Sequence, residues 1–561
     1  MAPTPGILYV TMQPQPGLPH SQFHDWYNNE HGATRLQQLP FVTNGFRYRA
    51  NDYNDAEPQP SEQKPEWMAI YDITDMAELT KEPYLRLRGP PVKTQREADA
   101  MARINVNRKL YDFLETWESK EFKRLEEVGN EGQGNVVLAV SLSLNPGEGM
   151  KEQVDKWYKE EHVEMMSKVP GWLRTRRFVT SSIDPNAAVE YLTLHEYAPK
   201  NGLWGPEFMA VTTTPWSSEI ASKVVKDKRG RVYDLYYTFG PAPRHLGPSL
   251  SEWTSTDPST PYPTKTFSTS PVSADYGAIE SFITTPDGVP LPYRLEGSSD
   301  PNAPLIVLCN SILVTWGIWD SFLTSFFSSP SNKKYRILRY QTRGRSSSCG
   351  ETPITVDLLA SDVIALLDAL RVKKAAAVIG VSLGGATALN TALKYPERVG
   401  SFISCDTSSK SPAGNSKAWG DRIAIAEKES AADPTSGEST VGQDLAELTV
   451  RRWFAKENYD GKDMERKVGE VKSMVATNSL EGFKKSVRAL FEYDMRDEMK
   501  NSAVKGMFVV GGSDGALPGS MKDMAASYGQ GGARFEVIGN AGHLPMVEKP
   551  EEFSRVVSSF L

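Results

Sequence analysis

The sequence predicts a multidomain fold, in which a duplicated α+β barrel precedes a doubly wound, mostly parallel α/β sheet with a helical lid. Three observations predict it. The first 240 residues repeat themselves, the next stretch is rich in Pro, Ser and Thr, and the C-terminal half alternates short apolar strands with helices. Such alternation is typical of a parallel sheet covered on both faces. We expect two repeats, a linker and an α/β domain with an inserted lid, over residues 1–120, 133–241, 242–277 and 278–561, the lid at 408–500.

The repeat is clearest in one helical segment. Phe23–His31, FHDWYNNEH, returns as Val154–His162, VDKWYKEEH, with Trp, Tyr, Glu and His in register. In each copy an alternating strand precedes this segment, and strands, a helix and a final strand follow it. This order predicts two ferredoxin-like units packed sheet to sheet. A period this long indicates a duplicated domain, because the units of solenoids are far shorter.

A Leu-Pro or Val-Pro step follows the Trp-Tyr-x-x-Glu-His segment in both copies, at Leu39-Pro40 and Val169-Pro170. On these residues the N-terminal half resembles the EthD-like branch of the dimeric α+β barrel proteins. The resemblance implies that two such units face each other within one chain. It also implies a possible activity, since some members of that branch are small decarboxylases or cyclases of polyketide-derived acids.

Three histidines of this half are candidates for a second site. His31 and His162 occupy equivalent positions, each directly after a glutamate, and such a pair can act as an acid or base near neutral pH. The alternative is that both copies keep these residues to seat the helix on the sheet. His195 lies on a predicted strand where the first copy has Tyr71, so it is the better candidate for a site specific to one copy, although a half-buried sheet histidine would look the same.

The C-terminal half is organised around Ala375–Tyr395. Ala375–Ile379 predicts a buried strand, Gly380–Gly384 a sharp turn, and Ala386–Tyr395 a helix. The pattern Gly-x-Ser-x-Gly puts Ser382 at the tip of this turn, where small neighbours are needed because a Cβ would clash. We therefore expect Ser382 to be a presented nucleophile.

A histidine and an acid complete the expected triad. Between residue 246 and the C-terminus the only histidine is His543, in a loop between a predicted strand and the closing helix. A serine hydroxyl needs a base to take its proton, and a third group must orient that base. The chain order serine, acid, histidine favours Asp514, which follows the strand Met507–Val510. Asp406, at the end of an earlier strand, is the alternative acid.

The other elements of this half follow from turn signals and apolar runs. Pro286-Asp287-Gly288 predicts the turn of a hairpin. The remaining predicted elements are strands at Leu305–Asn310, Tyr335–Tyr340 and Val399–Cys405, a helix at Asp357–Leu370 and a closing helix at Pro550–Leu561.

Three motifs, NSILVTWGIWDSF (from Asn310), RILRYQTRGRSSS (from Arg336) and GVSLGGATALNTALKYPERV (from Gly380), together with the helical insertion, resemble the 3-oxoadipate enol-lactonase group of α/β hydrolases. The resemblance covers this whole half, lid included. It implies a serine hydrolase with no metal or organic cofactor. It further implies that the backbone N–H groups of Ile312 and Leu383 form the oxyanion hole.

The rim of the expected pocket departs from that group. Where the group reads Tyr-Asp-Thr-Arg-Gly-His-Gly, this chain has Tyr340–Ser346, YQTRGRS. Arg343 in this stretch could bind a substrate carboxylate, or it could tie the loop to the sheet. Trp316, Trp419 and Trp453 are expected to line the substrate pocket. An aromatic wall favours a ring-bearing lactone or ester over a short diacid.

Composition limits the other function classes. A net charge of −7 without a basic cluster argues against nucleic-acid or membrane partners. No secretion signal or apolar run of membrane-spanning length is present, and the three cysteines, Cys309, Cys349 and Cys405, lack disulfide or zinc spacing. We expect a cytoplasmic protein without a metal.

The sequence thus predicts a cofactor-free serine hydrolase that cleaves a lactone or carboxylic ester, with an aromatic or polyketide-derived small molecule as substrate. Two alternatives stay open. The N-terminal barrel could be the main active module, a decarboxylase or cyclase, with the hydrolase half accessory. It could instead serve only for self-association, as a homo-oligomer.

Overall fold

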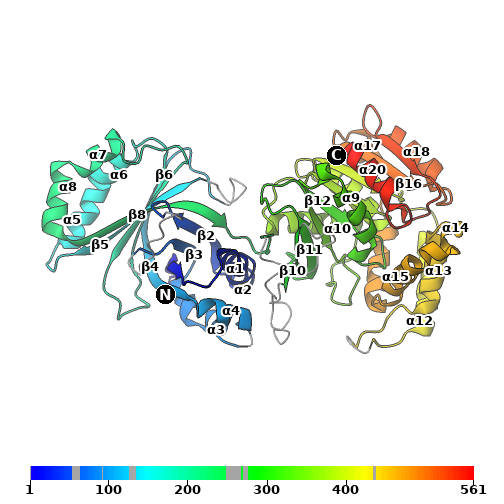
Figure 1. Cartoon of the computed structure of the whole chain (residues 1–561), viewed down its shortest axis with the longest axis horizontal. Coiled ribbons are helices and arrows are strands. Elements are labelled where there is room, and N and C mark those ends of the chain that lie inside the picture. Colours follow the sequence, from blue (N-terminus) through cyan, green and yellow to red (C-terminus); the bar gives the residue numbers. More distant parts are fainter. Residues whose placement is uncertain are drawn as a thin grey trace. The chain divides into compact units, whose positions relative to one another are not determined.

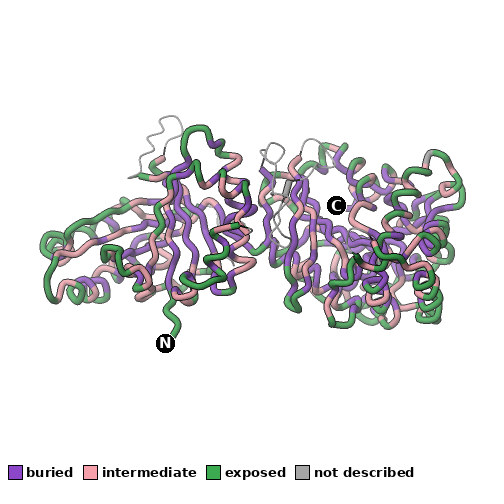
Figure 2. The backbone as a smooth tube through the Cα atoms, turned by 90° about the horizontal axis from the view of Figure 1, so that it is seen from below, coloured by how far each residue is buried: buried purple, intermediate pink, exposed green. Residues whose placement is uncertain are grey.

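The computed structural model describes residues 2–53, 64–90, 92–125, 134–247, 267–268, 276–433 and 437–561. These residues form two compact units. The first holds the described residues up to Pro243, and the second those from Arg244 onward (Figure 1). Most of the predicted linker, 242–277, lies outside the described residues. Buried residues are concentrated in the strands of the two sheets, whereas β4, β8 and β17 also contain exposed residues (Figure 2).

The first unit is a closed barrel of eight strands in the order β1-β3-β2-β8-β5-β7-β6-β4. The strands are β1 (Gly6–Pro14), β2 (Val42–Ala50), β3 (Trp67–Ile73), β4 (Ile104–Glu118), β5 (Val136–Leu144), β6 (Trp172–Thr180), β7 (Tyr191–Tyr197) and β8 (Val225–Thr238). The last strand of each repeat joins the two copies, because β4 pairs with both β1 and β6, and β8 with both β5 and β2. The two repeats therefore share one barrel.

The helical segment of the repeat takes the same form in both copies. In each, a single π turn interrupts the helix at the Tyr-x-x-Glu-His residues. The first copy has α1 (His20–Trp26), η1 (Tyr27–His31) and α2 (Gly32–Gln38), and the second has α5 (Met150–Trp157), η4 (Tyr158–His162) and α6 (Val163–Met166). The later helices are α3 (Glu82–Arg86) and α4 (Gln95–Met101) in the first copy, and α7 (Pro206–Thr212), α8 (Pro215–Glu219) and the π turn η5 (Ile220–Val224) in the second. The order of elements thus repeats, as predicted.

The barrel interior is filled by apolar side chains from all eight strands, among them Phe46, Met68, Tyr111, Phe178 and Leu194. Side chains alternate between the two faces of a strand, so the residues between these point outward, toward the helices. The outward face of each copy is where a ligand space can lie.

The second unit contains a nine-stranded sheet in the order β17-β16-β15-β14-β12-β13-β11-β10-β9. Its strands are β9 (Phe267–Ser268), β10 (Gly277–Thr284), β11 (Pro290–Gly297), β12 (Leu305–Cys309), β13 (Arg336–Tyr340), β14 (Ala377–Val381), β15 (Ser401–Cys405), β16 (Lys505–Gly511) and β17 (Arg534–Ile538). The strands from β12 to β17 are parallel, and the β10–β11 hairpin is antiparallel. The predicted parallel α/β sheet is confirmed. Within the predicted linker, Phe267–Ser268 pairs with β10 and forms an edge strand of this sheet.

The strands β12 to β15 are buried along their whole length, as expected for a parallel sheet covered on both faces. Among the helices that flank the sheet, α10 packs against α11 and α9 packs against α20. The helices flanking the sheet are α9 (Asp320–Ser328), α10 (Val356–Ala369), α11 (Leu383–Lys394), α18 (Leu517–Ala526), α19 (Pro545–Glu548) and α20 (Pro550–Phe560).

The segment between β15 and β16 is helical, as predicted for 408–500. Its helices are α12 (Asn415–Glu429), α13 (Gln443–Trp453), α14 (Lys456–Tyr459), α15 (Glu465–Ala476), α16 (Leu480–Ser486) and α17 (Arg496–Lys500). Among the described helices, none is long and apolar enough to cross a membrane. The three cysteines are buried and unpaired.

Candidate active site

Ser382 lies at the turn between β14 and α11, in a backbone conformation that side chains rarely adopt. Its φ is 59° and its ψ −119°, so the residue stands at a strained elbow. The two flanking glycines are sterically required, since a Cβ on Gly380 would lie 1.9 Å from the carbonyl oxygen of Gly384, and a Cβ on Gly384 2.2 Å from that of Cys309. Ser382 itself is half-buried. The elbow therefore presents its hydroxyl instead of enclosing it.

His543 and Asp514 are in direct contact. Nδ1 of His543 lies 2.6 Å from Oδ2 of Asp514. Burial raises the pKa of Asp514, but the hydrogen bond and charge of His543 outweigh it and hold that pKa below its usual value. Asp514 is therefore ionised at neutral pH. An ionised carboxylate at Nδ1 selects the imidazole tautomer that donates there, which leaves Nε2 as the basic nitrogen.

Asp406, the alternative acid, lies next to Asp514. Its Oδ1 accepts a hydrogen bond from the backbone N–H of Gly511 at 2.8 Å, and its buried Oδ2 has no donor among the described residues. Burial and the neighbouring Asp514 charge raise the pKa of Asp406 well above its usual value. Asp406 therefore keeps its proton to a higher pH than an ordinary aspartate does.

Donor atoms of Asp406, Asp514 and His543 lie within 4.8 Å of one another, a spacing that suits a cation as well as a proton network. A protonated carboxyl is a poor metal ligand, because ligands must give up their protons to bind. We assign no metal to this cluster.

Sheet topology explains why these groups converge. Ser382, Asp406 and Asp514 follow β14, β15 and β16, and the loop with His543 follows β17. These four strands are neighbours in the parallel sheet, so their carboxyl ends lie along one edge. That edge is where ligands bind in open α/β sheets.

Two backbone amides near the elbow are available as donors. Leu383 is the first residue of α11, and the first N–H groups of a helix lack partners within it. Ile312 lies in the buried loop after β12. Neither amide donates a hydrogen bond within the described part of the chain.

The three expected substrate-lining tryptophans lie in different places. Trp453, the last residue of α13, stacks on the His543 ring with centroids 5.7 Å apart, and its carbonyl accepts from the backbone N–H of His543 at 2.6 Å. Trp419 on α12 is buried against Phe483. Trp316 is half-buried after β12. Of the three, Trp453 contacts the predicted catalytic histidine.

Arg343 is not available to a substrate, which corrects its predicted binding role. Only 4% of the residue is exposed, and its guanidinium donates to both oxygens of Asp287 and of Asp362 at 2.7–2.8 Å. Four of the guanidinium's hydrogen bonds go to these two carboxylates, and Nη1 also donates to the carbonyl of Cys349 at 3.5 Å. The alternative interpretation, an arginine that ties the loop to its surroundings, accounts for this residue.

We expect Arg343→Ala to lower the free energy of unfolding by about 3–5 kcal/mol, because it leaves the Asp362 carboxylate buried and unpaired. Denaturant unfolding measures this loss. Arg488→Ala, at an exposed lid arginine, serves as the control and should change stability by less than about 0.5 kcal/mol. A stable Arg343→Ala protein with a raised KM only for carboxylate-bearing esters would restore the binding role.

Sequence reasoning missed Glu548, which connects the His543 loop to the lid. This buried carboxylate accepts hydrogen bonds from the backbone N–H groups of Gly542 at 2.7 Å and Ala455 at 2.9 Å, and from Asn458 Nδ2 at 2.6 Å. In the sequence it is one acid among several before the closing helix, so no local signal distinguishes it. Its contacts hold the loop directly before His543.

Of the N-terminal histidines, the structure brings two together. His162 and His195 have ring centroids 5.7 Å apart in the second copy. His31 belongs to the first copy, where its Nδ1 lies 2.9 Å from Oε1 of Glu97. The three predicted second-site residues therefore do not form one site.

Residues 306–556 match a family model described as "Alpha/beta hydrolase family". With the strand–elbow–helix unit and the parallel sheet, this match identifies the C-terminal half as an α/β hydrolase, and the protein is a hydrolase enzyme. Within that class this half is related to the 3-oxoadipate enol-lactonases. Two such lactonases from Acinetobacter baylyi are 28% and 27% identical over 280 and 278 residues, which is 50% and 49% of this chain and 96% and 95% of theirs.

Two further comparisons are a shorter sequence match and a solved structure. A zearalenone hydrolase from Bionectria ochroleuca is 32% identical over 124 residues, 21% of this chain and 44% of its own length. Among solved structures, the enol-lactonase from Burkholderia xenovorans is 25% identical with a TM-score of 0.43, covering 50% of this chain and 98% of that one.

Proposed function

We propose that the protein cleaves a lactone or carboxylic ester through an acyl-enzyme on Ser382. The observation that carries this proposal is the hydrogen bond between His543 and the ionised Asp514, at the same sheet edge as the strained elbow. That arrangement supplies a nucleophile, a base and an orienting acid in the order that serine hydrolysis needs.

In the proposed mechanism, His543 Nε2 takes the proton of the Ser382 hydroxyl as its oxygen attacks the substrate carbonyl. The N–H groups of Ile312 and Leu383 stabilise the negative charge on the carbonyl oxygen. The C–O bond to the leaving oxygen then breaks, and His543 gives that oxygen its proton. Water, activated by the same imidazole, attacks the acyl-enzyme and releases the acid and the free serine.

The proposed substrate carries a ring. The relatives named above are lactonases of 3-oxoadipate enol-lactone and a hydrolase of zearalenone. Trp453 against His543 and the buried Trp419–Phe483 pair make the lid side aromatic. An aromatic or polyketide-derived lactone fits such a wall better than a short aliphatic diacid lactone.

We expect dihydrocoumarin, an aromatic lactone, to be hydrolysed with a kcat/KM about tenfold above that of δ-valerolactone, since burying the fused ring contributes on the order of 1–2 kcal/mol. Titration of the released acid measures both rates. Trp419→Ala should reduce this preference and leave the rate on δ-valerolactone unchanged. Failure to hydrolyse any lactone or aryl ester would overturn the proposed function, whereas equal rates would overturn only the ring preference.

For the N-terminal unit the proposal is an EthD-like origin. The repeated order of strands and helices, the π turn at the Trp-Tyr-x-x-Glu-His segment in both copies and the closed barrel support it.

A further inference from the structure

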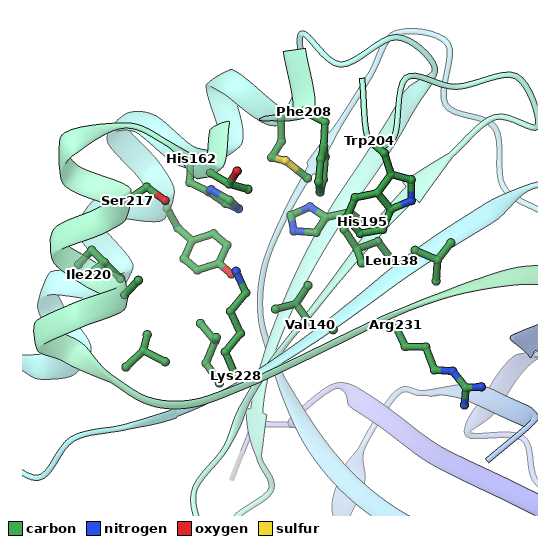
Figure 3. Close-up of a pocket in the computed structure, with 18 of the residues that line it drawn as sticks. Leu138, Val140, His162, His195, Trp204, Phe208, Ser217, Ile220, Lys228 and Arg231 are labelled. Carbon is green, nitrogen blue, oxygen red and sulfur yellow. The ribbon is translucent and has the colours of Figure 1, made fainter. Parts of the chain in front are cut away.

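A cavity of about 390 Å³ lies in the second copy of the N-terminal unit, between the outward face of the barrel and the helices that cover it. In Figure 3, Leu138, Val140 and Lys228 rise from the strands, while His162, Ser217 and Ile220 come from the helices opposite. The volume is in the lower part of the range of roughly 300–1,000 Å³ typical of small-molecule pockets. It suits a molecule of one or two rings.

The first copy provides an internal comparison, because the corresponding space there is only about 10 Å³. Tyr71 replaces His195, and the register is equivalent, since Tyr71 pairs with Leu8 and His195 with Leu138. The Tyr71 hydroxyl donates to that of Tyr27 at 3.2 Å, which closes the space.

Two other residues near Tyr71 and Tyr27 also have partners of their own. Phe239 stacks on the Tyr71 ring, with centroids 5.9 Å apart, and His31 is paired with Glu97 on α4. The two copies therefore share the same order of elements, but the space between sheet and helices is about 390 Å³ in the second and about 10 Å³ in the first.

Two histidines, His162 and His195, line the cavity. Nδ1 of His162 is buried and has no hydrogen bond within the described part of the chain. Nδ1 of the neighbouring His195 instead lies 2.9 Å from Oγ1 of Thr175. Burial, reinforced by nearby positive charges, lowers the pKa of both histidines, that of His195 to about 3. Both rings are neutral at pH 7, so His162 offers a hydrogen bond to a bound molecule without adding charge.

The charge at the cavity is positive. Arg231 lines it but is bound to Asp52 at 2.7 Å, so this pair is neutral overall. Lys228 also lines the cavity and is exposed at its rim. Among the described residues it has no ion-pair partner. A single negative charge on the ligand would complement Lys228, while Leu138, Val140 and Phe208 require an apolar body.

We infer that this cavity binds a small aromatic or alicyclic acid, with its carboxylate or phenolate at Lys228, its ring against the apolar wall and a polar substituent at His162. The site is separate from Ser382 and does not depend on the hydrolytic function. The second repeat would therefore bind a ligand for which the first repeat has no space.

The test is a calorimetric titration of the whole protein with 2-naphthoic acid and, separately, with the neutral 2-naphthamide. Val140→Trp fills the cavity, and His195→Tyr copies the closed first repeat. Lys228→Gln removes the charge and keeps the shape, and Lys226→Gln, at an exposed lysine of the same strand that does not line the cavity, is its matched control.

We expect one naphthoate site that Val140→Trp and His195→Tyr both abolish, while circular dichroism and thermal unfolding of both variants match the wild type and show that the N-terminal unit is folded. Lys228→Gln should weaken naphthoate about tenfold, as expected for a lost charge-assisted hydrogen bond, and leave naphthamide unchanged. Lys226→Gln should change neither. No naphthoate binding, or binding that survives both cavity-filling variants, would overturn the site. Equal affinity for acid and amide would overturn the assigned ligand class.

Discussion

Ser382→Ala should lower kcat for lactones and aryl esters by about 10⁶-fold. The residual rate would be the one that the oxyanion donors and substrate binding supply without a nucleophile. The substitution removes the oxygen that forms the acyl-enzyme, and neither His543 nor the oxyanion donors can replace it. Because alanine meets the same backbone strain at φ 59° as serine, the free energy of unfolding should change by less than about 0.5 kcal/mol.

Steady-state rates, with denaturant unfolding on the same samples, check both parts. Ser361→Ala, on α10 and away from the elbow, is the matched control and should keep full activity. A fluorophosphonate probe should label the wild-type chain on the peptide that contains Ser382 and should not label the Ser382→Ala variant. Hydrolysis retained by that variant would refute the proposed nucleophile.

Asp514→Asn should lower kcat by about 10⁴-fold, whereas Asp406→Asn should cost less than about tenfold. An amide at 514 can donate to Nδ1 of His543, which favours the wrong tautomer, and it cannot stabilise the imidazolium. Because the pKa of Asp406 is raised, asparagine is close in charge and shape to the protonated form that burial favours. Equal losses in the two variants would mean that both carboxylates act on the histidine directly.

The same pair predicts a pH dependence of stability. The pKa of Asp406 is raised in the folded state, so above the unfolded value of roughly 4 the folded protein holds a proton that the unfolded chain has lost. The wild type should therefore lose stability relative to Asp406→Asn as the pH rises from about 4 toward neutral. Unfolding free energies of both proteins over this interval measure the difference. A constant difference would show that Asp406 is ionised in the folded protein.

Several features of the active half could be predicted from local sequence because each depends on neighbours along the chain. The Gly380 and Gly384 spacing is set by clashes within one turn. Asp514 and His543 follow strands, and parallel strands bring their carboxyl ends together whatever the loops contain. The single histidine of this half left no competitor for its place in the predicted triad.

Features that depend on distant partners required the structure. The role of Arg343 depends on Asp287 and Asp362, which are 56 and 19 residues away in the chain. The raised pKa of Asp406 results from its burial and from the charge of Asp514, and a sequence pattern records neither of them.

The sequence by itself determined the α/β architecture of the second half, the repeated order of elements in the first, and the residue types that a nucleophilic hydrolase needs. Only the tertiary structure decided that one copy of the repeat is closed and the other open. The Trp-Tyr-x-x-Glu-His pattern is the same in both, and the difference is the volume left when His195 stands in the position of Tyr71. Periodicity reports which face of an element is covered, whereas the space between two covered faces depends on every side chain that meets there.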